Sequence, residues 1–387
     1  MTLVAPDSQD RQGSFEQGPI RPPSEARSLL VRVTRNCPWN RCTFCHTYQG
    51  ARFSLRPLAE VKQDILSMAV AAEEIRRLSD ACGEDGVVGT ATIRQVFSRT
   101  DGFSEAHRSV AAWLHYGGDS VFLQDANSLI VKTDELVEIL SFIRESLPSV
   151  RRITTYARAR TAAKKSLKDL LRLREAGLSR IHVGMESACD PLLDFIQKGT
   201  TAAEQVDAGQ KIKQAGIALC EYVMPGLGGK RWSEEHAIAT AQALNQINPD
   251  HIRLRTLRII PGSALADRHQ AGEFEPLDDE AILREIRLFC ATLNGVSSRL
   301  VSDHMLNLLE ELEGKLPEDR ARLLGVIDRY FALEEKTRAV FRLGRKLGAY
   351  RHLDDLDDAE TFRHLSLTLS QQEDPQQYLA KLRQPRL

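Results

Sequence analysis

The sequence lacks both a long hydrophobic run and an excess of charge of either sign. No apolar stretch approaches the ~20 residues that a membrane-spanning helix needs, so we expect no association with a membrane. The chain has 52 basic and 53 acidic residues, so it lacks the positive charge typical of nucleic-acid-binding domains. The first residues also lack the basic and apolar segments of a secretory signal, and we therefore expect a cytoplasmic protein.

Cysteine is scarce, but its placement is uneven. The isolated cysteines, which we expect to be buried or half-buried apolar side chains, are Cys82, Cys189, Cys220 and Cys290. The other three, Cys37, Cys42 and Cys45, lie close together, directly after an apolar stretch with β propensity at 28–34. Three thiolates on one loop at the end of a strand can hold a metal or cluster and leave one coordination position open for chemistry.

Other interpretations of the cysteine run remain open. The segment Cys42-Thr43-Phe44-Cys45-His46 matches a haem attachment pattern, but covalent haem requires an oxidising compartment. Structural zinc with His46 as the fourth ligand is possible, although such sites usually draw a second ligand pair from farther along the chain. A disulfide would leave one of the three thiols unpaired. An iron–sulfur cluster is the leading interpretation.

Strand and helix patterns alternate along most of the chain, which predicts an α/β fold with a parallel sheet and right-handed crossovers. The strands are expected at 29–33, 120–124, 152–156, 180–184, 217–224 and 251–259. In barrels built from alternating strands and helices, the chemistry takes place at the carboxyl ends of the strands, and the cysteine run lies at such an end.

The remaining segments predict further divisions of the chain. Residues 1–27 are polar and are expected to form a flexible arm, and residues 71–116 interrupt the alternation as an insertion. Residues 271–387 are expected to be mainly helical. Within them, one apolar stripe predicts a helix that carries Val301, Met305, Leu308, Leu309 and Leu312 on one face, and a further helix is expected from Lys315.

The cysteine run and a second element, Gly184-Met185-Glu186-Ser187, resemble the radical S-adenosylmethionine (SAM) superfamily. The second element is similar to that of the subgroup containing the Elongator catalytic subunit and oxygen-independent coproporphyrinogen oxidase. The first cysteine gap is one residue longer than the usual C-x3-C-x2-C spacing. The resemblance implies a partial (β/α)6 TIM-like barrel over residues 28–270 with a C-terminal helical appendage. It also implies a [4Fe–4S] cluster on Cys37, Cys42 and Cys45, with SAM on the fourth iron.

The resemblance also implies residues that contact SAM. Asp125 and Asn127 stand where the family often has a Gly-Gly-Glu motif that binds the amino group of SAM, although both residues also suit an ordinary strand-ending turn. Arg158 or Arg160 could hold the SAM carboxylate as a bidentate pair, or both could be solvated surface residues.

Two later strand ends complete the predicted set. Glu186 is expected to accept hydrogen bonds from the ribose hydroxyls, and its neighbour Ser187 is either part of that contact or a helix cap. Gly226 is expected to let the backbone approach adenine, unless it serves only the turn.

The implied activity is reductive cleavage of SAM to a 5′-deoxyadenosyl radical, with electrons from a flavodoxin- or ferredoxin-like donor. We expect an unidentified small-molecule substrate. An RNA-modifying enzyme and a non-catalytic module stabilised by zinc or an iron–sulfur cluster are the alternatives. A late basic run could clamp an acidic substrate or form a solvated helix face, and it comprises Arg338, Arg342, Arg345, Lys346 and Arg351.

Overall fold

The computed structural model describes residues 14–98 and 102–382, and it confirms the α/β fold class. The strands are β1 (Leu29–Arg32), β2 (Thr34–Arg35), β3 (Ser54–Leu55), β4 (Ser120–Gln124), β5 (Arg152–Ala157), β6 (Leu178–Glu186), β7 (Ala218–Val223), β8 (His251–Leu254), β9 (Arg299–Val301) and β10 (Gly314–Lys315). Eight of them form one sheet in the order β1-β4-β5-β6-β7-β8-β9-β10, while β2 and β3 form a separate antiparallel pair. Parallel pairing joins β1 to β4, β4 to β5, β7 to β8 and β8 to β9, whereas β10 is antiparallel to β9.

Helices follow most of the strands. They are α1 (Leu58–Ala81), α2 (Thr90–Ser98), α3 (Glu105–His115), α4 (Thr133–Ser146), α5 (Ala159–Lys164), α6 (Leu167–Ala176), α7 (Asp190–Phe195), α8 (Ala202–Gln214), α9 (Gly229–Ile247), α10 (Ala264–Gln270), α11 (Asp279–Thr292), α12 (Arg320–Ala332), α13 (Glu335–Leu347), α14 (Ala359–Ser370) and α15 (Pro375–Lys381). Short 3-10 helices lie at Pro23–Glu25, Ser128–Ile130 and Leu353–Asp357. In the described part of the chain, no helix combines the length and the apolar character that crossing a membrane requires.

The chain divides into two compact units. Unit 1 contains residues 1–40, 47–182 and 211–218, and unit 2 contains residues 41–46, 183–210 and 219–387. The first division falls inside the cysteine loop, so Cys37 belongs to unit 1, and Cys42 and Cys45 belong to unit 2.

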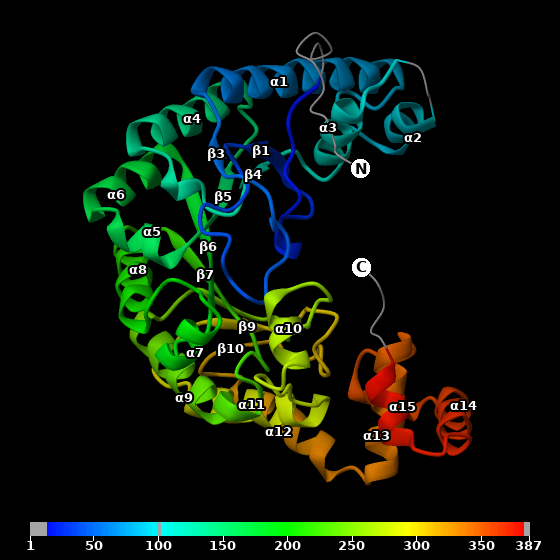
Figure 1. The fold of residues 1–387 in the computed structure, drawn as a ribbon. Helices are drawn as coiled ribbons and strands as arrows, with labels where there is room; N and C mark the ends of the chain where they lie inside the picture. Colours follow the sequence, from blue (N-terminus) through cyan, green and yellow to red (C-terminus); the bar gives the residue numbers. More distant parts are fainter. Residues whose placement is uncertain (1–13, 99–101, 383–387) are drawn as a thin grey trace. The chain divides into compact units, whose positions relative to one another are not determined.

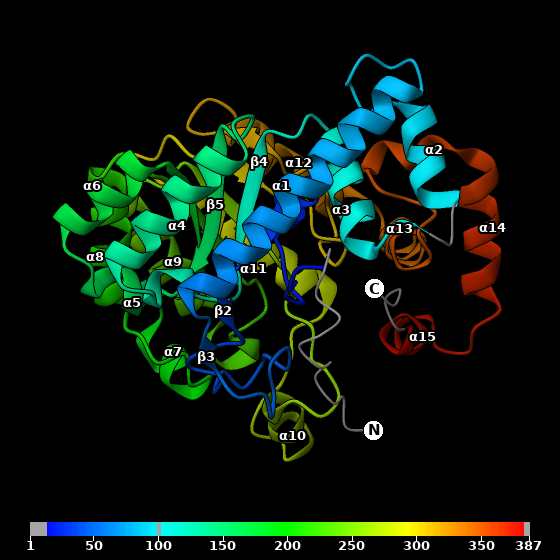
Figure 2. The same cartoon turned by 90° about the horizontal axis from the view of Figure 1, so that it is seen from above.

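In unit 1, helices α1, α4 and α6 pack side by side along the parallel strands (Figures 1 and 2). Helix α1 buries a stripe at helical spacing, including Val61, Ile65 and Met68, and α4 buries Leu136, Ile139, Leu140 and Ile143 in the same way. Helix α6 ends at Gly177, whose left-handed φ of 119° is readily available only to glycine. Apolar burial along these helices holds the strand ends of unit 1 in place.

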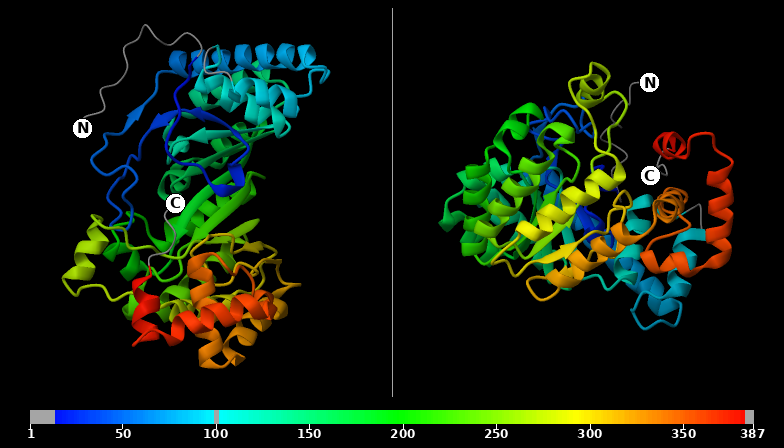
Figure 3. Two further views of the ribbon diagram at one scale, coloured as in Figure 1. Left: turned by 90° about the vertical axis from the view of Figure 1, so that its right-hand side faces the viewer. Right: turned by 90° about the horizontal axis from the view of Figure 1, so that it is seen from below.

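In unit 2, α9 packs on α11 and α11 packs on α12. The C-terminal helices α13, α14 and α15, drawn in orange and red, lie together in both views of Figure 3, and α13 contacts the other two. Tyr330, Phe341 and Tyr350 pack their rings against one another in this region. Aromatic burial of this kind supplies much of the apolar contact between short helices.

The six predicted strands correspond to β1, β4, β5, β6, β7 and β8, although β8 stops at Leu254, short of the expected end at 259. The helix predicted across 301–312 was wrong, because Val301 ends β9 and turns follow it. Buried Asn307 explains the difference: its Oδ1 accepts a bond from the Thr256 amide at 3.1 Å and its Nδ2 donates to the Leu254 carbonyl at 2.9 Å. These bonds satisfy the main chain beyond β8 and favour a loop over a helix. The helix expected from Lys315 begins at Arg320.

Candidate cofactor site

The cysteine loop leaves β2 through two residues with left-handed backbone, Asn36 (φ 68°) and Asn40 (φ 48°). Asparagine tolerates this conformation better than most residues, so the sequence supports a tight path here. The Asn40 amide donates to Cys37 Sγ at 3.5 Å, and the Cys45 amide donates to the Cys42 carbonyl at 3.1 Å. Cys37 and Cys42 are half-buried and Cys45 is exposed, and none of the three is in a disulfide.

The donor set of this loop suits an iron–sulfur cluster, because it offers three thiols outside any disulfide and an amide N–H directed at one of them. Within residues 14–98 and 102–382, no three His, Cys, Asp or Glu side chains already stand together as a metal site. The cysteines therefore remain predicted ligands.

Asp125 follows β4 and is fully buried. Its Oδ2 accepts bonds from Arg32 Nε at 2.9 Å, Arg32 Nη2 at 2.5 Å and the Asn36 amide at 3.0 Å. Its Oδ1 accepts a bond from the Tyr48 hydroxyl at 2.9 Å. Burial, followed by the nearby Asp125 carboxylate, raises the pKa of Tyr48, so that hydroxyl stays protonated and donates. Asp125 thus joins the two ends of the cysteine loop to β4.

Asn127 and Arg158 lie close together in unit 1. Asn127 Oδ1 accepts a bond from the Arg158 amide at 3.1 Å, and Asn127 Nδ2 donates to Thr161 Oγ1 at 2.8 Å. The Arg158 guanidinium lies 4.8 Å from the centre of the Trp39 ring, within range of a cation–π interaction. These contacts tie the end of β5 to the end of β4 and to the first part of the cysteine loop.

The start of the described chain lies on the same strand ends. The Gly18 amide donates to Gln124 Oε1 at 2.8 Å, and Gln124 Nε2 donates to the carbonyls of Gly18 and Ile20 at 3.0 and 2.8 Å. Glu16 accepts bonds from Arg32 Nη1 at 2.9 Å and Arg35 Nη2 at 2.6 Å. Residues 16–20 are thus fixed by hydrogen bonds, while residues 1–13 of the predicted arm lie outside the described part of the chain.

Glu186 ends β6 with a left-handed φ of 63°. Its Oε1 accepts a bond from Lys198 Nζ at 3.2 Å, and a Cβ at Gly184 would lie only 2.4 Å from the same oxygen. Lys198 Nζ also lies 5.6 Å from the centre of the Phe44 ring, which belongs to the cysteine loop in unit 2. The sequence therefore places glycine where the Glu186 side chain needs the space.

Glu221 in β7 is buried, and its Oε2 has no hydrogen-bond partner. Burial raises the pKa of Glu221 well above its usual value, the Glu186 carboxylate raises it further, and Lys198 opposes both effects. Burial therefore favours the protonated form of Glu221 beside the Glu186–Lys198 pair.

Ser187 and Gly226 form contacts within unit 2. Ser187 Oγ lies 2.8 Å from His236 Nδ1 and accepts a bond from the Cys189 amide at 3.1 Å. The Gly226 amide donates to Glu285 Oε1 at 2.7 Å, and Gly226 has a φ of 84° that favours glycine. Both residues are bonded to groups of the chain itself in this structure.

Sequence reasoning missed several residues that hold these strand ends, namely Arg32, Tyr48, Lys198 and Glu221. Two left a signal in the sequence, because Arg32 and Glu221 are charged residues inside apolar strands. Tyr48 left none, since its partner Asp125 lies 77 residues away along the chain.

Comparison with known proteins found distant relatives. A tRNA uridine(34) acetyltransferase of Methanocaldococcus jannaschii is 22% identical over 120 residues, which are 31% of this chain and 22% of that protein. The Elp3 structure of Methanocaldococcus infernus has a TM-score of 0.39 at 16% identity and covers 48% of each chain. The coproporphyrinogen III oxidase HemN of Escherichia coli has a TM-score of 0.43 at 14% identity and covers 68% of this chain and 52% of its own. The chain therefore spans about half the length of these structures, and less of the acetyltransferase.

A family model also matches, under the description Radical SAM superfamily, over residues 31–241. This match confirms the resemblance drawn from the cysteine run and from Gly184-Met185-Glu186-Ser187. Enzymes of the family use a [4Fe–4S] cluster and SAM, and they need a reductant. Because the match covers more than half of the 387 residues, the chain belongs to the radical SAM superfamily.

Proposed function

We propose that this radical SAM enzyme acts on a small molecule and that Cys37, Cys42 and Cys45 are the cluster ligands. The donor set supports this assignment, because three thiols outside any disulfide share one short loop. When bound, the cluster and SAM supply reductive cleavage of the sulfonium and hydrogen abstraction from the substrate. The protein holds both groups, orients the substrate and excludes water.

Glu186 is the residue whose setting best supports a contact to SAM. Lys198 Nζ donates to its carboxylate at 3.2 Å and holds it in place, and Gly184 leaves room beside it. An ionised carboxylate accepts two hydroxyl hydrogen bonds, which suits a ribose. Asp125, Asn127, Ser187 and Gly226 already bond to groups of the chain, so their support for direct contact to SAM is weaker.

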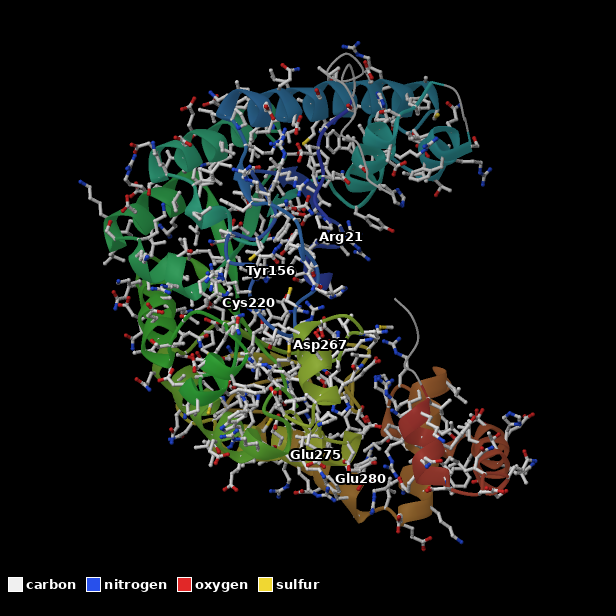
Figure 4. The ribbon with its side chains drawn as sticks, in the orientation of Figure 1. Arg21, Tyr156, Cys220, Asp267, Glu275 and Glu280 are labelled. Carbon is white, nitrogen blue, oxygen red and sulfur yellow. The ribbon has the colours of Figure 1, made fainter. Side chains whose placement is uncertain are left out.

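The pairing of the late basic run carries the proposal of a small-molecule substrate. Arg338 Nε, in α13, lies 3.0 Å from Oε1 of Glu280, which is in α11 and is labelled in Figure 4. Arg345 and Arg351 bind Glu310 at 2.8 and 2.9 Å, and Lys346 binds Asp279 at 3.0 Å. These cations are compensated within unit 2, so they offer little free charge to a phosphate backbone.

The similarity to a tRNA uridine(34) acetyltransferase favours an RNA substrate as the second candidate. The small-molecule and RNA candidates predict a different dependence of RNA binding on salt concentration. We expect no saturable RNA binding at about 0.15 M salt, where surface charges are largely screened. Saturable RNA binding at this salt, with a log Kd that rises steeply and linearly with log salt concentration, would support the RNA candidate instead.

Anaerobic reconstitution tests the cluster assignment. We expect about four iron and four sulfide per chain and formation of 5′-deoxyadenosine when SAM and dithionite are added. One zinc per chain with no sulfide would contradict the assignment. A flavodoxin- or ferredoxin-like donor should replace dithionite in the cytoplasm, the compartment we propose because the seven cysteines, all in the described part of the chain, form no disulfide.

A further inference from the structure

The cysteine loop starts and ends on the same buried side chain. The Asn36 amide, one residue before Cys37, donates to Asp125 Oδ2 at 3.0 Å. The Tyr48 hydroxyl, three residues after Cys45, donates to Asp125 Oδ1 at 2.9 Å. All of these atoms belong to unit 1, whereas residues 41–46 between them belong to unit 2. The two ends of the loop are therefore fixed within one unit.

The Asp125 carboxylate has little capacity left for another donor. Its oxygens accept bonds from Arg32 Nε, Arg32 Nη2, the Asn36 amide and the Tyr48 hydroxyl. Three of these donors share Oδ2 and saturate that oxygen, whereas Oδ1 accepts only the Tyr48 bond. The Asp125 side chain is also fully buried. A SAM ammonium group could bind Oδ2 only by displacing one of these donors, and Gly18 lies against Oδ1.

A second layer holds the same group in place. Arg32 Nη1 binds Glu16 Oε1 at 2.9 Å, so the guanidinium that pairs with Asp125 is itself fixed from the other side. Gly18 lies against the carboxylate, since a Cβ at that position would be 2.2 Å from Asp125 Oδ1. Charge-assisted bonds of this kind are about twice as strong as neutral ones, and they fix the geometry of the ions as well.

We infer that Asp125 is a positioning residue: it sets the path of the cysteine loop through Asn36 and Tyr48 and does not itself contact SAM. Only the expected effect of Asp125 on the cluster depends on the proposed function, that is, on the assignment of the three cysteines as cluster ligands. The loop restraint belongs to the protein alone, and it can be measured without the cluster.

The first test is thiol alkylation of reduced, cluster-free protein, followed residue by residue by mass spectrometry. Asp125→Asn keeps the shape and the acceptor for Tyr48, but it places an NH2 group opposite Arg32 or Asn36. We expect Cys37 to react about tenfold faster, which corresponds to loss of one charge-assisted hydrogen bond. Tyr48→Phe removes a single hydroxyl and should raise the rate about threefold.

Buried Cys290 and half-buried Cys82, both outside the loop, are the internal references. Their rates should stay at the wild-type level in both variants. Equal acceleration at Cys290 would show general unfolding, and unchanged rates at Cys37 in Asp125→Asn and Tyr48→Phe would show that the bonds do not restrain the loop. Either result overturns the inference.

The second test separates positioning from contact with SAM. In the reconstituted protein, we expect Asp125→Asn to alter the electron paramagnetic resonance spectrum of the reduced cluster already before SAM is added. A variant with wild-type alkylation and a wild-type cluster spectrum but much weaker SAM binding would assign Asp125 to the SAM contact and refute the inference. If the wild-type protein assembles no cluster, the proposed function fails while the alkylation result still stands.

Discussion

Two buried glutamates, one in each unit, show opposite electrostatics. Glu25 in unit 1 accepts bonds from Arg152 Nη1 and Ser28 Oγ, both at 2.6 Å, and lies 3.3 Å from His182 Nε2. Burial alone would raise its pKa, but these hydrogen bonds lower it to about 2. Glu221 in unit 2 is equally buried, yet its Oε2 has no partner and its pKa is raised.

The difference extends to the neighbouring strand ends. Asp125 and Asn127 of unit 1 are bonded on both side-chain polar atoms to the chain itself. Around Glu186 in unit 2, by contrast, a buried acid retains an oxygen without a donor. Saturated polar groups fix a backbone, whereas unsaturated ones cost stability unless a ligand completes them. The comparison therefore indicates that Asp125 and Asn127 hold the path of the cysteine loop. It favours contact with a ligand for Glu186 and Glu221.

The largest expected effect comes from the loop that both units share. Cys42→Ala should lose the cluster iron and all 5′-deoxyadenosine formation, because it leaves the proposed cluster only two thiolate ligands. Iron and sulfide analysis after anaerobic reconstitution measures this. Cys82→Ala, which changes a half-buried thiol at the end of α1, is the matched control and should keep its iron. Full iron content in Cys42→Ala would remove the proposed ligand.

The two glutamates should give stability profiles of opposite slope with pH. The folded pKa of Glu25 is lowered from 4.5 to about 2, so its stabilisation is present above pH 4.5 and is lost as the pH falls towards 2. This amounts to about 3 kcal/mol, and Glu25→Gln should flatten the profile in that range.

The folded pKa of Glu221 is raised, so its contribution is present below pH 4.5 and is lost as the pH rises through the folded value. Glu221→Gln should therefore make the protein more stable at neutral pH, and urea unfolding across pH measures both variants. Destabilisation of Glu221→Gln at pH 7 would mean that Glu221 is ionised, and the comparison would fail.

An intermediate effect is expected at Lys198. Lys198→Met removes the cation from partly buried Glu186 and should cost about 2 kcal/mol, the range for a buried charge left without its partner. Lys62→Met removes an exposed partner of Glu138 and should cost at most about 0.5 kcal/mol. The free energies of unfolding of the two variants in urea decide the point, and equal values would show that the Glu186 pair is an ordinary surface pair.

The smallest effect is expected at Arg158. Arg158→Gln removes the charge above the Trp39 ring and should cost about 0.5–1 kcal/mol. Thermal unfolding measures the loss. A much larger fall in SAM affinity than in stability would instead support the predicted contact between Arg158 and the SAM carboxylate.

The sequence was informative where the signal is local. The apolar stretch at 120–124 predicted β4 at its observed bounds, and the cysteine run led to the family. Pairing between distant segments could not be predicted from the sequence. Strand β9 is only three residues long and is positioned by its pairing with β8, and the turns after it depend on Asn307. The partners of Asp125 could not be predicted for the same reason, since Arg32 lies 93 residues away along the chain.

The close approach of Gly18 to Asp125 has a practical consequence for anyone preparing this enzyme. A trimmed gene that starts after residue 18 would delete the Glu16 carboxylate and the Gly18 amide together, and would uncover Arg32 and Gln124. A bulky residue at position 18, left by a tag or a cloning scar, would collide with the carboxylate at 2.2 Å. Preparations that differ only at their amino terminus should therefore differ in how well they load iron.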